Sequence, residues 1–178
     1  MEGLIYPNWQ YADTLPDKYS FYYAGFDYGS SHASALILLG YADGKLYAYK
    51  EYKQAGLSNT QILNGIVSTL GETKLPIYAD PSAAGFIRDM KRIGLNVRRA
   101  NNDVLPGIQT TQTLLESGKL LISRDCPELI KELHGYTWAT NDSADKPVKA
   151  NDDAVDALRY AVMSTMTKPV AVSRFTRR

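Results

Sequence analysis

The chain has few of the residues that build disulfide frameworks and histidine-rich metal centres. Its 178 residues include one cysteine, Cys126, and two histidines, His32 and His134. A single cysteine excludes a disulfide framework and a zinc site built from cysteines. The sequence also has no apolar run of membrane-spanning length and no secretory signal. We therefore expect a soluble protein of a reducing compartment.

A large excess of charge of either sign is also absent, because the formal net charge is +1. This balance excludes a surface that is basic throughout, so any contact with a polyanion must be local. The length fits one domain, and there is no internal repeat or low-complexity block. We expect a lead-in segment over residues 1–20, one domain over 21–167 and a basic tail over 168–178.

The order of the predicted elements indicates a mixed α/β fold. Strands are expected over 21–28, 33–41 and 45–53, with a tight turn at Asp43-Gly44. Ser58 and Gln61 form a capping-box pattern before a helical stripe that ends at Gly71. The remaining expected elements are strand 75–80, helix 83–92, strand 95–99, helix 106–117, strand 119–123, helix 127–134, a hairpin or flap over 136–150 and a helix over 152–166. The pattern predicts three antiparallel strands followed by parallel β/α units, in one sheet flanked by helices.

Three aspartates stand at the ends of these elements. Asp27 ends the first strand, Asp80 ends the strand over 75–80, and Asp156 lies in the first turns of the last helix. Carboxylates carried out of a core are unfavourable unless a cation meets them, and a hard divalent metal ion binds such oxygen ligands. Each aspartate alone also has a structural explanation, as a turn residue or as an acid that favours a helix N-terminus. The three together favour metal-dependent phosphate chemistry.

The sequence around these aspartates resembles a known family. Three segments carry the resemblance: Gly25-Phe26-Asp27-Tyr28-Gly29, Tyr78-Ala79-Asp80-Pro81-Ser82 and Asn151-Asp152-Asp153-Ala154-Val155-Asp156-Ala157-Leu158-Arg159-Tyr160-Ala161. They are similar to the acidic motifs in the nuclease domain of the terminase large subunit of tailed bacteriophages. The resemblance covers nearly the whole chain and implies an RNase H-like fold. In many relatives a histidine stands where this chain has Asp153, which leaves open whether Asp153 is a metal ligand, a neighbour of the ligands or neither.

The resemblance also implies an endonuclease that cuts concatemeric double-stranded viral DNA with little sequence specificity. Two Mg²⁺ or Mn²⁺ ions about 3.5–4 Å apart would act on the scissile phosphate. Asp27 is the expected bridging ligand, and Asp80 and Asp156 would each bind one ion. The implied partners are a small terminase subunit and the portal, and the implied location is the host cytoplasm during infection.

The family protein also has an ATPase motor domain, but this sequence has no Gly-x-x-x-x-Gly-Lys-Ser/Thr motif. We therefore expect that this chain does not hydrolyse ATP and that it is the C-terminal part of a longer protein.

Local groups of basic residues are the candidates for contact with DNA. The candidates are Arg88, Lys91, Arg92, Arg98 and Arg99 in one stretch, with Lys146 and Lys149 on the expected flap. Lys149 is the best single candidate for a lysine near the scissile phosphate. For any single one of them, the simpler interpretation is a solvated surface charge of little energetic value. The functional interpretation predicts contacts to the DNA backbone, with steep salt dependence and little base preference.

Three other interpretations remain open from the sequence. Another RNase H-like nuclease, such as a Holliday-junction resolvase or a transposase core, would share the aspartates. The segment 25–31 also resembles the first phosphate loop of actin-like ATPases, although that fold needs two such domains and this chain is too short. A docking domain without catalytic activity is the third, and the three aspartates argue against it.

Overall fold

A computed structural model describes residues 3–140 and 145–166, and a central mixed sheet organises them. Its seven strands lie in the order β1-β7-β4-β3-β2-β5-β6. The strands are β1 (Gln10–Tyr11), β2 (Phe21–Asp27), β3 (Ser34–Ala42), β4 (Lys45–Gln54), β5 (Ile77–Ala79), β6 (Val97–Arg99) and β7 (Leu120–Ile122). The strands β2, β3 and β4 are antiparallel, whereas β5 and β7 join the outer strands of this group in parallel. The predicted mixed sheet is therefore confirmed.

Local sequence explains the first hairpin and the first helix. Asp43 and Gly44 have φ angles of 51° and 78°, which a tight turn between β3 and β4 requires. Helix α1 (Asn59–Leu70) begins with the predicted capping box, in which the Ser58 side chain accepts a hydrogen bond from the Gln61 amide and the Gln61 side chain accepts one from the Ser58 amide. These features depend on neighbouring residues alone, so the sequence predicts them well.

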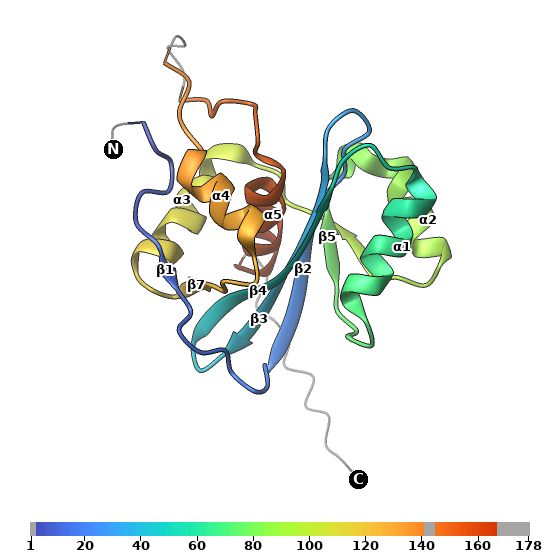
Figure 1. The fold of residues 1–178 in the computed structure, drawn as a ribbon, viewed down its shortest axis with the longest axis horizontal. Coiled ribbons are helices and arrows are strands. Elements are labelled where there is room, and N and C mark those ends of the chain that lie inside the picture. Colours follow the sequence, from blue (N-terminus) through green and yellow to red (C-terminus); the bar gives the residue numbers. More distant parts are fainter. Residues whose placement is uncertain (1–2, 141–144, 167–178) are drawn as a thin grey trace.

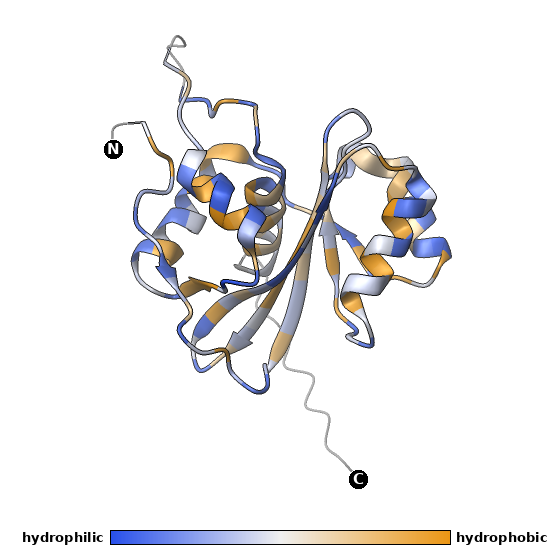
Figure 2. Cartoon of the chain, viewed as in Figure 1, coloured by the Kyte–Doolittle hydropathy of each residue, from blue (hydrophilic) through white to orange (hydrophobic). Residues whose placement is uncertain are grey.

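Helices cover both faces of the sheet (Figure 1). One face packs against α1 and α2 (Ala84–Arg92), and the other against α3 (Val104–Glu116), α4 (Pro127–Gly135) and α5 (Asp153–Met166). Figure 2 shows that α1 and α2 turn hydrophobic residues toward the sheet and hydrophilic residues outward. Because β3 has helices on both sides, its side chains are almost all buried.

The N-terminal stretch, expected as a lead-in segment outside the domain, is partly built into it. Ile5 and Tyr6 are 1% exposed and belong to the core, and β1 pairs in parallel with β7 at the edge of the sheet. A strand of two residues is too short to give a periodic pattern, which is why the sequence showed none. The N-terminal stretch therefore contributes Ile5 and Tyr6 to the core and residues 10–11 to the sheet.

The expected hairpin over 136–150 is present as two short arms. Trp138 and Pro147 form an antiparallel bridge, and the Ala139 amide donates to the Lys146 carbonyl at 2.7 Å. Most of its polar tip, residues 141–144, and the tail over 168–178 lie outside the described residues. None of the described helices combines the length and hydrophobicity that a membrane crossing needs.

A close approach between α5 and β2 positions the candidate site. A Cβ atom added to Gly25 would lie 1.8 Å from the Ala157 carbonyl oxygen and 2.9 Å from the Ala161 nitrogen. Only glycine therefore lets the helix lie directly on this strand. The contact brings the first turn of α5 to the end of β2, where Asp27 is located.

Candidate metal centre

The three aspartates predicted from the sequence lie around one polar hollow. Asp27 is the last residue of β2, and Asp80 directly follows the parallel neighbour β5, in which Ala79 pairs with Phe26. Asp156 is in the first turn of α5. The hollow has a volume of about 720 Å³, and its other charged or ionisable side chains are Tyr28, His32, Lys53, Lys149, Asp152, Asp153 and Tyr160. The geometry gathers carboxylates from three separate elements at one place.

Asp27 is buried without a partner. Its exposed fraction is 9%, and within the described part of the chain no hydrogen bond or ion pair joins its carboxylate to another residue. Burial is the main cause that raises the pKa of Asp27 to about 8, and the nearby carboxylates of Asp156, Asp153, Asp152 and Asp80 act in the same direction. At neutral pH such a carboxylate is mostly protonated, and a cation that reached it would favour its ionised form.

Asp156 is also buried, but two cationic side chains contact it. Its carboxylate lies 3.2 Å from the Arg159 guanidinium and 3.2 Å from Lys149 Nζ. Burial raises the pKa of Asp156, although Arg159 and Lys149 oppose that rise. The backbone carbonyls of Asn102 and Asp103 accept hydrogen bonds from Arg159. We did not predict this arginine, although its position three residues after Asp156 on a helix is a signal that could have found it.

Asp80 combines a structural contact with a position in the hollow. One carboxylate oxygen accepts a hydrogen bond from the Ser82 amide at 2.8 Å, and the other accepts one from the Tyr160 hydroxyl at 2.9 Å. Burial raises the pKa of Asp80, but these hydrogen bonds outweigh it and leave the pKa below its ordinary value. Of the three predicted aspartates, Asp80 is therefore the one that ionises most easily before any metal ion binds.

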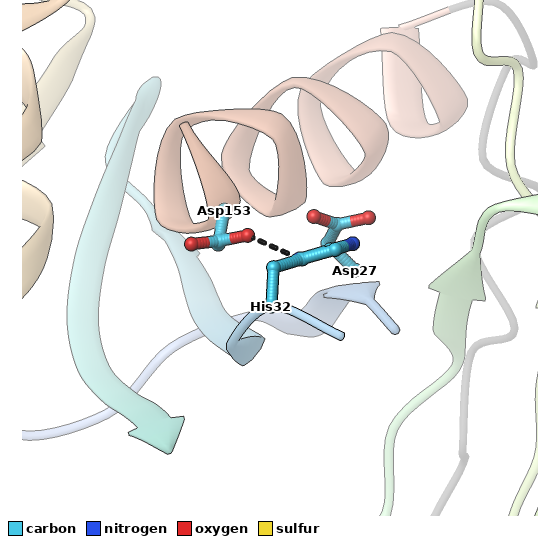
Figure 3. Close-up of side chains that lie close together, drawn as sticks. All are labelled: Asp27, His32 and Asp153. Carbon is cyan, nitrogen blue, oxygen red and sulfur yellow. Dashed lines mark hydrogen bonds and ion pairs between the residues drawn. The ribbon is translucent and has the colours of Figure 1, made fainter. Parts of the chain in front are cut away.

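Asp153 contacts a histidine and a lysine. Its Oδ1 lies 2.6 Å from His32 Nδ1, and its Oδ2 lies 3.6 Å from Lys53 Nζ. Figure 3 shows the His32 ring between the carboxylates of Asp153 and Asp27. One potential ligand atom from each of these three side chains lies within 4.8 Å of the other two. Neither His32 nor Lys53 was predicted, although His32 follows Asp27 by five residues in the turn between β2 and β3.

The predicted basic residues separate into several places. Lys149 lies in the acidic hollow, with Nζ 3.2 Å from Asp152 and from Asp156. Arg88 and Arg92 line a second hollow of about 590 Å³, which shares Tyr28, His32 and Ser82 with the first. Arg92 also forms an exposed ion pair with Asp89 at 3.3 Å.

The other predicted basic residues lie outside these two hollows. Arg98 and Arg99 are exposed on the edge strand β6. Lys91 is exposed on α2. Lys146 lies on the hairpin. Of the five basic residues between positions 88 and 99, only Arg88 and Arg92 line the hollow next to the acidic one.

The comparisons with known proteins agree on one family. The family model described as terminase RNaseH-like domain matches residues 24–165. The terminase large subunit of Escherichia phage T5 is 28% identical over 150 residues, which cover 79% of this chain and 34% of that protein. This chain thus spans about a third of its curated relative.

Solved structures give the same fold. The large terminase of a thermophilic bacteriophage is 30% identical, with a TM-score of 0.86 over 92% of this chain and 46% of that one. The large terminase nuclease domain of bacteriophage SPP1, solved with bound Mn, is 20% identical, with a TM-score of 0.72 over 88% of this chain and 96% of that one. The second likeness extends over nearly the whole of a separate nuclease domain.

Proposed function

This chain belongs to the terminase RNaseH-like domain family, and from that premise we propose that it is a metal-dependent endonuclease that cuts concatemeric double-stranded DNA during viral packaging. The observation that carries the proposal is the buried Asp27 carboxylate, without a partner of its own in the described part of the chain and facing Asp80 and Asp156 across one hollow. An anionic cluster of this kind favours a divalent cation and a phosphodiester substrate.

The residues fit one or two hard divalent cations. The donors are carboxylate oxygens, which Mg²⁺ and Mn²⁺ accept, and an unpaired buried carboxylate is what a bound cation would neutralise. The SPP1 relative was solved with bound Mn, which supports a divalent ion here. In the proposed arrangement Asp27, Asp80 and Asp156 would hold two Mg²⁺ or Mn²⁺ ions, with Asp27 as the shared ligand. Such ions would supply activation of water and stabilisation of the leaving 3′ oxygen.

The protein's own residues orient the carboxylates. Arg159 is 2% exposed and donates to two backbone carbonyls, and these contacts position its guanidinium 3.2 Å from the Asp156 carboxylate. Tyr160 donates to Asp80 and holds that carboxylate from the same helix. The side chain of Lys149 is 67% exposed, which leaves it able to turn from Asp156 toward a phosphate of the substrate.

Backbone phosphates are the proposed contacts of the basic residues. Arg88 and Arg92 line a hollow that borders the acidic one and shares lining residues with it, so a strand lying across both would place its phosphates beside them. The remaining candidates, Lys91, Arg98, Arg99 and Lys146, would act farther along the duplex. Contacts of this type carry no sequence information, which agrees with unspecific cutting. We further propose that the ATPase motor domain of a longer protein, the small subunit and the portal are partners, in the host cytoplasm.

Nicking of supercoiled plasmid tests the proposal. Wild-type protein is incubated with Mn²⁺, Mg²⁺ or EDTA beside Asp80→Ala and, as a matched control, Asp17→Ala, which removes an exposed carboxylate that does not line the hollow. We expect metal-dependent nicking that Asp80→Ala abolishes and Asp17→Ala retains. Absence of nicking by a folded wild-type protein under every metal would contradict nuclease activity of this chain and favour a docking domain. Strong preference for a four-way junction over duplex would instead favour a resolvase.

A further inference from the structure

His32 has a hydrogen-bonding environment that defines its tautomer. Its Nδ1 lies 2.6 Å from Asp153 Oδ1 and 2.9 Å from the Ala33 carbonyl oxygen. Both neighbours accept hydrogen bonds, so Nδ1 carries the hydrogen. In the neutral ring Nε2 then keeps its lone pair, which can bind a cation.

The Asp153 carboxylate is held from both sides. Oδ1 accepts from His32, and Oδ2 lies 3.6 Å from Lys53 Nζ, which is also 3.7 Å from the buried Glu132. Lys53 is on β4, and its side chain is 14% exposed. Asp153 therefore has a fixed orientation and little remaining capacity as a metal ligand, whereas it can orient an imidazole well.

The far edge of the imidazole faces the hollow. Figure 3 shows the ring extending from the Asp153 side toward the Asp27 carboxylate, and ligand atoms of the three side chains lie within 4.8 Å of one another. In metal sites a coordinating histidine almost always donates its other ring N–H to a carboxylate or a backbone carbonyl. His32 has one of each.

We propose that His32 is a ligand, through Nε2, of a divalent cation held at Asp27, and that Asp153 is the positioning carboxylate that orients it. This inference rests on the proposed function only in requiring that Asp27 binds metal. A site with one imidazole among carboxylates binds Mn²⁺ and Co²⁺ better than a site of oxygen ligands alone, whereas Mg²⁺ gains little from a nitrogen ligand. The inference therefore assigns His32 a part in metal selectivity.

Pulsed electron paramagnetic resonance of bound Mn²⁺ tests the coordination directly, because a coordinated imidazole nitrogen couples to the electron spin. We expect a nitrogen coupling in wild type that disappears in His32→Ala and persists in His134→Ala, the matched control at the other histidine. Calorimetric titration should show that His32→Ala and Asp153→Asn each weaken Mn²⁺ binding by ~10–100-fold and change Mg²⁺ binding much less. Circular dichroism checks that each variant is folded.

The outcomes separate the two proposals. Mn²⁺ binding that is lost in Asp27→Asn but shows no nitrogen coupling in wild type, or a coupling that survives in His32→Ala, would overturn the role of His32 and leave the nuclease proposal standing. Equal Mn²⁺ affinity of wild type and Asp27→Asn would overturn both, because Asp27 would then hold no ion.

Discussion

Replacement of Asp27 by asparagine should stabilise the metal-free protein above neutral pH, although it removes a proposed catalytic residue. The carboxylate is buried, unpaired within the described part of the chain and surrounded by other carboxylates, and its pKa is raised to about 8 from 3.8. Between these two values the folded state retains a proton that the unfolded state has lost. The contribution of Asp27 to stability should therefore be complete at pH values below 3.8 and be lost as pH rises through the folded pKa.

The size of the effect follows from the shift. One pKa unit corresponds to about 1.4 kcal/mol, so the rise in the pKa of Asp27 would remove on the order of 5 kcal/mol by pH 9. Glu132, 3% exposed, also has its pKa raised to about 8 by burial, and it adds a slope of the same sign. Asparagine has the shape of aspartate without its ionisation, so Asp27→Asn should be more stable than wild type at pH 9 by about 2–4 kcal/mol.

Urea unfolding in EDTA at pH 5, 7 and 9 measures this difference, with Asp17→Asn as the control for loss of an exposed carboxylate. Asp27→Asn should flatten the pH dependence, and addition of Mn²⁺ should stabilise wild type but not the variant. Equal pH slopes in wild type and Asp27→Asn, or a variant less stable than wild type at pH 9, would refute the reasoning.

Two further predictions concern the helix contact and the DNA path. Gly25→Ala places a methyl group 1.8 Å from the Ala157 carbonyl oxygen, so the free energy of unfolding in urea should fall by about 3 kcal/mol or more. In Gly85→Ala the new Cβ meets only Arg88, at 3.9 Å, so the free energy of unfolding should be unchanged or rise by up to about 1 kcal/mol. An intact stability in Gly25→Ala would mean that α5 can move from β2. The double variant Arg88→Ala with Arg92→Ala should lower the slope of log Kd for duplex DNA against log salt concentration by about 1–2, as measured by fluorescence anisotropy. Lys74→Ala should leave that slope unchanged. An unchanged slope in the double variant would mean that the duplex binds elsewhere.

Much of the fold could be predicted because its signals are local. The tight turn at Asp43-Gly44 and the capping box at Ser58 depend on residues within four positions of each other, and the structure contains both. Strand β1 could not be predicted, because two residues carry no period and their pairing with β7 depends on a segment more than 100 residues away.

For the candidate site too, some features follow from the local sequence and others from the tertiary structure. The sequence alone determined that Asp27 and Asp80 stand at strand ends and that Asp156 lies early in a helix, since hydrophobic patterns mark where elements end. Only the tertiary structure decided that these elements meet, because strand order and the close contact at Gly25 are properties of the assembled sheet.

The contact between His32 and Asp153 joins residues 121 positions apart, and no local pattern predicts such a pairing. Which carboxylate remains unpaired, and which cation reaches its neighbour, depends on packing between distant segments. For that reason the sequence identified the acidic residues, and the tertiary structure decided their partners.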